Sequence, residues 1–147
     1  MEEILNLDNQ LCFRLYSISR KMTKAYEPLL GKYNLTYPQY IVMLALFKHE
    51  IIDFKDLSIE INLSPGTLTP LLKRLEELSY LERIKNPEDS RRMNVVLSKK
   101  GYELREKIVD VPLGMAEKLQ LSIEKYTTLI KELDDLNLML DEINQQL

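Results

Sequence analysis

Apolar residues recur at helical spacing over most of the chain and alternate only in its middle. Near the start the intervals are three and four, at Leu11, Leu15, Ile18 and Met22. This pattern predicts a first helix, with Asp8 as its N-cap. A second helix is expected to begin at Thr36 with Pro38 in its first turn. Its apolar run over residues 40–47 indicates deep burial.

Two further short helices follow. The first covers residues 54–61, and Ser64-Pro65-Gly66 predicts a turn after it. The second carries a leucine stripe at Leu68, Leu71, Leu72, Leu75 and Leu78. Two short helices joined by so brief a connection indicate a helix-turn-helix. Pro70 leaves two alternatives: the helix kinks there, or its regular part begins there with Thr69 as cap.

A β-hairpin is expected next. Residues 81–84 and 93–97 alternate in part, and the turn formers at 86–90 separate them. Ser98 is expected to cap a helix that runs to Pro112. Small hydroxyl residues at the start of the leucine helix and basic residues on the hairpin suit contacts to phosphates and bases. The hairpin would be a wing whose arginines reach the minor groove, although a merely solvated turn is the alternative.

Ser122 is expected to cap a last helix with apolar residues three and four apart. These are Tyr126, Leu129, Leu133, Leu136, Leu140, Ile143 and Leu147. Such a stripe is either a core face of one monomer or the seam of a dimer. The middle of the chain offers little to cover it, which favours a dimer interface built from the first and last helices.

Charge is unevenly distributed along the chain, whose formal net charge is −3. Residues 73–100 hold eight basic and five acidic residues, a net charge of +3. Residues 106–147 hold four basic and nine acidic residues, a net charge of −5. The basic middle suits DNA, and the acidic end is expected to face away from it.

Cys12 is the one cysteine and His49 the one histidine among the 147 residues. No disulfide within the chain is possible, and neither a metal site nor another cofactor is expected. No apolar run approaches the roughly 20 residues of a membrane span, and the Met-Glu-Glu start is unlike a secretion signal. We therefore expect a cytoplasmic protein.

Four segments together resemble the MarR family of transcription regulators, in particular the OhrR-like one-cysteine sensors of organic peroxides. They are Gln10-Leu11-Cys12-Phe13 with Tyr16, Leu35-Thr36-Tyr37-Pro38-Gln39-Tyr40, residues 66–76, and Pro87-Glu88-Asp89-Ser90-Arg91. One departure is Ser64-Pro65, where the sensors usually have Asp-Ser. It concerns the operator sequence more than the fold.

The resemblance implies a mainly α fold with a small β-hairpin wing, a winged helix-turn-helix that dimerises through its N- and C-terminal helices. We expect one domain over 1–147, with dimerisation helices at 1–35 and 113–147 and the DNA-binding region at 36–112. The predicted DNA-binding residues are Ser64, Gly66, Thr67, Thr69, Pro70, Lys73, Arg74, Lys85, Arg91 and Arg92. The expected partners are a pseudo-palindromic operator in double-stranded DNA and a second copy of the chain.

The resemblance also implies that Cys12 senses oxidation, held by Tyr16, Tyr26 and Tyr37, partly from the other subunit. An early position in its helix favours the thiolate, which attacks a peroxide oxygen. Without a second cysteine the sulfenate would form a mixed disulfide with a small thiol or overoxidise. We expect a repressor that organic hydroperoxide and a low-molecular-weight thiol release from DNA.

Three other interpretations remain open from the residues. A MarR-type regulator could respond to a small phenolic or apolar ligand, with Cys12 merely structural. An enzyme with Cys12 as nucleophile would want His49 nearby, but His49 follows the apolar helix in a polar stretch, so we expect no enzyme. A helical adaptor using the leucine stripe would leave the basic hairpin without a purpose.

Overall fold

The computed structural model describes residues 3–145 and divides into two compact units, up to Leu113 and from Gly114 onward. The first unit begins with a 3-10 turn, η1 (Leu7–Asn9), and the long helix α1 (Leu11–Leu30). Gln10 is the N-cap of α1, so the prediction that Asp8 caps it is wrong. Asp8 instead lies inside η1, where its backbone N–H donates to the Asn6 side chain at 3.0 Å.

Helix α2 (Tyr37–His49) follows a second 3-10 turn, η2 (Gly31–Tyr33), and begins where the sequence predicted. Thr36 is its N-cap, and the Thr36 backbone N–H donates to the Gln39 side chain at 2.9 Å. Pro38 lies in the first turn, which has no hydrogen bond to lose there. Most of α2 is buried, which agrees with its apolar run.

Helices α3 (Phe54–Glu60) and α4 (Pro65–Glu77) form the helix-turn-helix. The turn lies earlier than predicted, at residues 61–63, where Asn62 has a φ of 51°. Ser64 is the N-cap of α4, and its hydroxyl accepts from the Thr67 N–H at 3.3 Å. Pro70 lies within the helix, so the alternative of a helix that begins at Pro70 is wrong.

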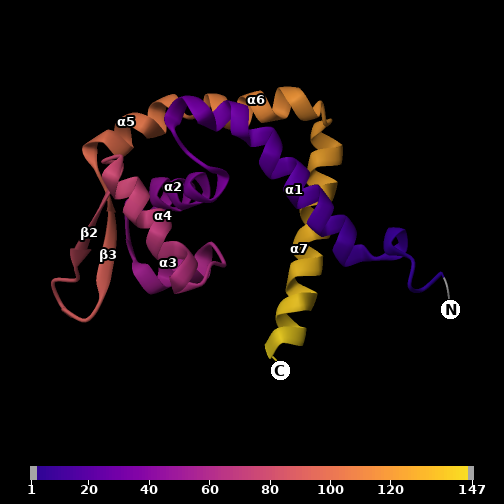
Figure 1. The fold of residues 1–147 in the computed structure, drawn as a ribbon, viewed down its shortest axis with the longest axis horizontal. Helices are drawn as coiled ribbons and strands as arrows, with labels where there is room; N and C mark the ends of the chain where they lie inside the picture. Colours follow the sequence, from indigo (N-terminus) through magenta and orange to yellow (C-terminus); the bar gives the residue numbers. More distant parts are fainter. Residues whose placement is uncertain (1–2, 146–147) are drawn as a thin grey trace. The chain divides into compact units, whose positions relative to one another are not determined.

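Three antiparallel strands form a small sheet in the order β1-β3-β2. The hairpin strands β2 (Leu81–Lys85) and β3 (Met93–Leu97) confirm the prediction, and Figure 1 shows them extending away from α3 and α4. Leu81 pairs with Leu97 and Lys85 with Met93. The strand β1 (Ile51–Asp53), which pairs with β3 on its other side, was not predicted.

The core of the first unit joins α2, α4 and the sheet. Fully buried side chains come from each of them, including Met43, Leu46, Leu72, Leu75 and Val95. The leucine stripe of α4 therefore faces the body of the unit. This burial holds the opposite face of α4 toward solvent.

The helix predicted from Ser98 to Pro112 is divided into α5 (Lys99–Lys107) and the start of α6 (Asp110–Leu119). Ser98 caps α5 as expected, accepting from the Gly101 N–H at 3.0 Å. Asp110 pairs with Lys32 and accepts from the Tyr33 hydroxyl at 2.9 Å. These contacts tie η2 to the beginning of α6, and the Lys32 hydrogen bond lowers the pKa of Asp110.

The second unit contains the rest of α6 and the long helix α7 (Ile123–Gln145), which Ser122 caps as predicted. No described residue of α7 is buried. In its apolar stripe, Tyr126, Leu133, Leu140 and Ile143 are exposed, and Leu129 and Leu136 are half-buried. Leu147 lies outside the described residues. Among the described helices, none is long and apolar enough to cross a membrane.

Candidate nucleic-acid interface and cysteine site

The exposed face of α4 carries all the predicted DNA-binding residues of this helix. They are Ser64, Gly66, Thr67, Thr69, Pro70, Lys73 and Arg74. They share this face because Leu68, Leu72 and Leu75, at helical spacing, are fully buried on the other. The structure thus brings together hydroxyls, the N-terminus of α4 and two cations on one accessible surface.

The start of α4 leaves room for a ligand to approach its backbone. Ser64 Oγ lies 2.9 Å from Thr67 Oγ1, and the Thr69 hydroxyl donates to the Pro65 carbonyl at 2.8 Å. A Cβ added at Gly66 would meet no atom within 4 Å. Among residues 3–145 no atom requires glycine there, whereas close approach of a phosphate to the helix N-terminus would benefit from it.

The wing presents two of its predicted basic residues to solvent. Lys85 is exposed, and the Arg91 side chain is 90% exposed although its Nε donates to Asp89 Oδ1 at 3.1 Å. The turn itself is held by Asn86, whose side-chain oxygen accepts from the backbone N–H groups of Glu88 and Asp89. A fixed turn with an exposed arginine suits insertion into a DNA groove.

Arg92, also predicted to contact DNA, is held against the body of the first unit. Its Nε donates to Asp53 Oδ2 at 3.0 Å, and its Nη2 lies 3.6 Å from Asp56 Oδ2. Asp53 also caps α3 by accepting from the Lys55 N–H at 2.9 Å. The Arg92 hydrogen bond lowers the pKa of Asp53. Arg92 therefore fixes the wing to the first helix of the helix-turn-helix. The role of Asp53 was not predicted, because no local sequence pattern connects it with Arg92.

A second ion pair joins the wing to α4. Arg83 donates to Glu76 from Nη2 at 2.6 Å and from Nε at 3.1 Å, and its backbone N–H donates to the same carboxylate. The Arg83 hydrogen bonds lower the pKa of Glu76. Because Arg83 and Glu76 join the wing to α4, the exposed cations of these two elements belong to one connected part of the structure.

Cys12 is exposed and lies at the second position of α1, closer to the helix start than the predicted cap implied. Tyr16, one turn further along, is 59% exposed. Its hydroxyl oxygen accepts from Arg20 Nη1 at 2.9 Å, and the Arg20 guanidinium carbon lies 5.5 Å from its ring centroid. Cys12, Tyr16 and Arg20 therefore follow one another at intervals of four along α1.

The other two predicted tyrosines lie elsewhere in the unit. Tyr26 and Tyr37 are in contact, with ring centroids 4.9 Å apart, and Tyr40 packs against Tyr26 at 5.9 Å. Burial raises the pKa of Tyr40 to about 12. Because α1 rises about 1.5 Å per residue, Tyr26 is about 21 Å from Cys12 along the axis. One chain thus brings only Tyr16 near Cys12.

The fold and its exposed α4 and wing define a winged helix-turn-helix regulator. Over residues 24–108 the chain matches the model of the transcriptional regulators SarA/Rot. The organic hydroperoxide resistance transcriptional regulator of Bacillus subtilis (strain 168) is 46% identical over 116 residues, covering 77% of this chain and 79% of the relative. The chain belongs to the SarA/Rot family of DNA-binding transcriptional regulators, and its resemblance to MarR-family regulators of the organic-peroxide group is confirmed.

Solved structures of AbfR, a protein of Staphylococcus epidermidis, have the same fold. Reduced AbfR bound to DNA is 29% identical and has a TM-score of 0.84, covering 97% of this chain and 99% of AbfR. Overoxidized AbfR bound to DNA is also 29% identical, with a TM-score of 0.77 over 95% of this chain and 98% of AbfR.

Proposed function

We propose that this regulator is a homodimeric repressor that leaves its operator when organic hydroperoxide oxidises Cys12. The observation that carries the proposal is the place of Cys12: exposed, at the second position of α1, one turn before a tyrosine hydroxyl. Backbone N–H groups at a helix start favour negative charge on sulfur and on the sulfenate that follows.

The names of similar proteins support the same chemistry. The Bacillus subtilis relative is an organic hydroperoxide resistance regulator, and AbfR has been solved in reduced, overoxidized and disulfide forms. His49 offers little support for an enzyme, since its Nε2 lies 2.6 Å from Glu60 Oε2 at the far end of α2.

The chemistry has two balanced steps. The Cys12 thiolate attacks the terminal peroxide oxygen; the S–O bond forms as the O–O bond breaks, and the leaving alkoxide takes up a proton to become an alcohol. A small thiol then attacks the sulfenic sulfur, a disulfide forms, and water leaves. The chain's single cysteine requires that this thiol come from outside the chain.

A second copy of the chain would complete the cysteine site. Tyr26 lies about 21 Å along α1 from Cys12, and Tyr37 of α2 is in contact with Tyr26, so the same chain does not supply either tyrosine to Cys12. Phenolic donors from the partner subunit would stabilise the charged sulfur, and bulk added at the junction would change the spacing of the two α4 helices. These helices must lie about 34–36 Å apart to contact successive half-sites.

DNA binding itself is assigned to α4 and the wing. The start of α4, with Ser64, Gly66 and Thr67, would contact phosphates and base edges, and Thr69, Pro70, Lys73 and Arg74 extend that surface. Lys85 and Arg91 of the wing would contact the adjacent minor groove of the DNA. Arg92 would act by holding the wing in position through Asp53, rather than by extending from the wing into the DNA.

Mass spectrometry of the intact protein tests the redox assignment. After treatment with one equivalent of cumene hydroperoxide, wild type is expected to gain one oxygen at Cys12 and then, on addition of a small thiol, to carry that thiol as a disulfide. Cys12→Ser should gain neither. Wild-type protein that stays unmodified would contradict the assignment and favour a regulator that responds to a small phenolic or apolar ligand.

A further inference from the structure

Pro70 lies at the centre of the exposed face of α4. At about 100° per residue, its side chain points about 160° away from Leu72 and about 140° away from Leu75, which are fully buried. Gly66 and Lys73 lie on the same face, one turn before and one turn after Pro70. Pro70 itself is exposed, so its ring is accessible to a partner outside the chain.

The helix itself does not explain a proline at this position. Pro70 lies in the interior of α4, where it has no N–H to donate to the Gly66 carbonyl. Proline is the least favourable residue in a helix interior, although it suits the first turn, where Pro65 lies. The ring of Pro70 therefore weakens the helix and lies outside the described core. The reason for a proline here must lie in what the exposed face contacts.

The hydroxyl groups near Pro70 make hydrogen bonds within the chain. Ser64 Oγ lies 2.9 Å from Thr67 Oγ1, and the Thr69 hydroxyl donates to the Pro65 carbonyl at 2.8 Å. The ring of Pro70 has neither a donor nor an acceptor, so it can bind a base only through an apolar contact. In the major groove of DNA, the apolar group on the base edges is the C5-methyl group of thymine.

We propose that Pro70 is a specificity-determining residue that recognises the C5-methyl group of a thymine in the operator. This inference rests on the proposed function, in which the first turns of α4 lie against base edges. A Cβ added at Gly66 would meet no atom within 4 Å, so the side chain missing there leaves room for the methyl group beside the ring. Lys73 and Arg74, one turn further along, would contact the neighbouring phosphates.

DNA that contains uracil in place of thymine tests this contact, because uracil pairs in the same way and lacks only the methyl group. The probe is a promoter fragment from upstream of the protein's own gene, amplified with either dTTP or dUTP. Fluorescence anisotropy gives the dissociation constant of the reduced protein for each DNA. The constant for uracil DNA divided by that for thymine DNA is the thymine preference. Methyl contacts of other residues are the same in every variant, so a comparison of variants isolates position 70.

Pro70→Gly removes the ring, whereas Pro70→Val keeps an apolar side chain, and both variants restore the backbone N–H. Wild type is expected to prefer thymine DNA about fourfold for each buried methyl group, hence about fifteenfold for the two subunits of a dimer. Pro70→Gly should lose this preference, and Pro70→Val should keep most of it. Both should be at least as stable as wild type to urea, since glycine and valine suit a helix interior better than proline. An unchanged preference in Pro70→Gly, or its equal loss in Pro70→Val, would overturn the proposal.

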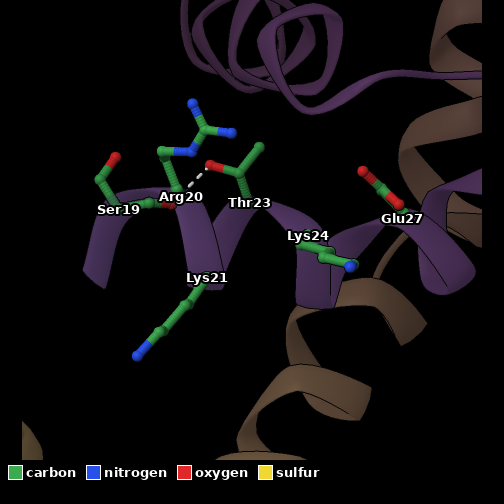
Figure 2. Close-up of a pocket in the computed structure, with 6 residues that line it drawn as sticks. All are labelled: Ser19, Arg20, Lys21, Thr23, Lys24 and Glu27. Carbon is green, nitrogen blue, oxygen red and sulfur yellow. Dashed lines mark hydrogen bonds between the residues drawn. The ribbon is translucent and has the colours of Figure 1, made fainter. Parts of the chain in front are cut away.

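Two lysine variants separate this inference from the proposed function. Lys73→Gln removes a positive charge from α4, and Lys24→Gln removes one from α1, where Lys24 lines the polar groove of Figure 2. Lys73→Gln should weaken binding to both DNAs equally, and Lys24→Gln should change neither affinity by more than about twofold. If Lys73→Gln weakens binding no more than Lys24→Gln does, the assignment of DNA binding to α4 fails. If Lys73→Gln weakens binding but Pro70→Gly keeps the wild-type preference, only the thymine contact fails.

Discussion

Gly101 and Gly66 both lie in helices, but they differ in the space that surrounds them. Gly101 in α5 is buried, and a Cβ there would lie 2.3 Å from the Tyr80 carbonyl oxygen and 2.5 Å from Leu97 Cδ1. Gly66 in α4 is exposed, and a Cβ there would lie in open space. The first glycine serves packing, and the second leaves the helix start accessible.

We predict that Gly66→Ala folds with a stability within about 1 kcal/mol of wild type, since alanine suits a helix better than glycine. Its affinity for operator DNA should fall about tenfold, because the methyl group stands where phosphate approaches the helix start. Urea unfolding and fluorescence anisotropy measure the two effects. Gly101→Ala, as the control, should lose about 1–3 kcal/mol of stability by overpacking. Unchanged DNA affinity in Gly66→Ala would contradict this interface.

The Asp53–Arg92 ion pair predicts a pH dependence. Asp53 has a lowered pKa because of the Arg92 hydrogen bond, so this pair stabilises the fold above the ordinary carboxyl pKa of about 4. The stabilisation is lost as the pH falls through the lower, folded pKa. Asp53→Asn keeps the cap of α3, because asparagine caps as well as aspartate does, and removes the ion pair.

At pH 7, Asp53→Asn should lower the melting temperature by about 1–3 °C. The difference from wild type should shrink as the pH falls below about 4, as measured by thermal unfolding followed by circular dichroism. A difference that persists at low pH would show that the ion pair is not its cause.

The helix α4 was predictable from the sequence because its leucines have the spacing that one buried face requires. Ser64 and Pro65 were interpreted as a turn, although a serine cap before a proline at the first position is itself a helix start. The strand β1 was missed because it has three residues and exists by pairing with β3, more than forty residues away. Such a pairing leaves no local pattern in the sequence.

The exposed cations of α4 predict a measurable salt dependence. Lys73→Gln should weaken binding to all DNA sequences alike, and the slope of log affinity against log salt should fall by about 0.9 per subunit. Anisotropy titrations over a range of potassium chloride concentrations measure this slope. A variant that alters sequence preference with an unchanged slope would instead place Lys73 on a base edge.

The apolar stripe of α7 predicts the effect of a charge in the dimer interface. Leu133 is 48% exposed in the single chain, and Leu133→Asp should shift the protein from dimer to monomer by about a hundredfold or more in dissociation constant, as sedimentation velocity would show. Thr128→Asp adds the same charge on the polar side of α7 and should leave the dimer intact. Equal sedimentation of all three proteins would place the interface elsewhere.

For the whole molecule, local patterns in the sequence were sufficient to predict the helix-turn-helix and the hairpin, but not the break between α5 and α6. The connections between elements were not predictable. Arg92 was assigned to DNA by its charge, but its contact with Asp53 joins residues 39 positions apart. Tyr26 and Tyr37 were assigned to Cys12 through the resemblance, and one chain keeps them away from it.

In the proposed function, the oxidation state of Cys12 controls DNA binding. The direct measurement is fluorescence anisotropy of labelled promoter DNA from upstream of the protein's own gene, with wild type and Cys12→Ser, before and after cumene hydroperoxide with 3-mercaptopropionate. We predict that both proteins bind when reduced, and that only wild type releases the DNA after treatment. Release of both proteins, or of neither, would contradict control through Cys12.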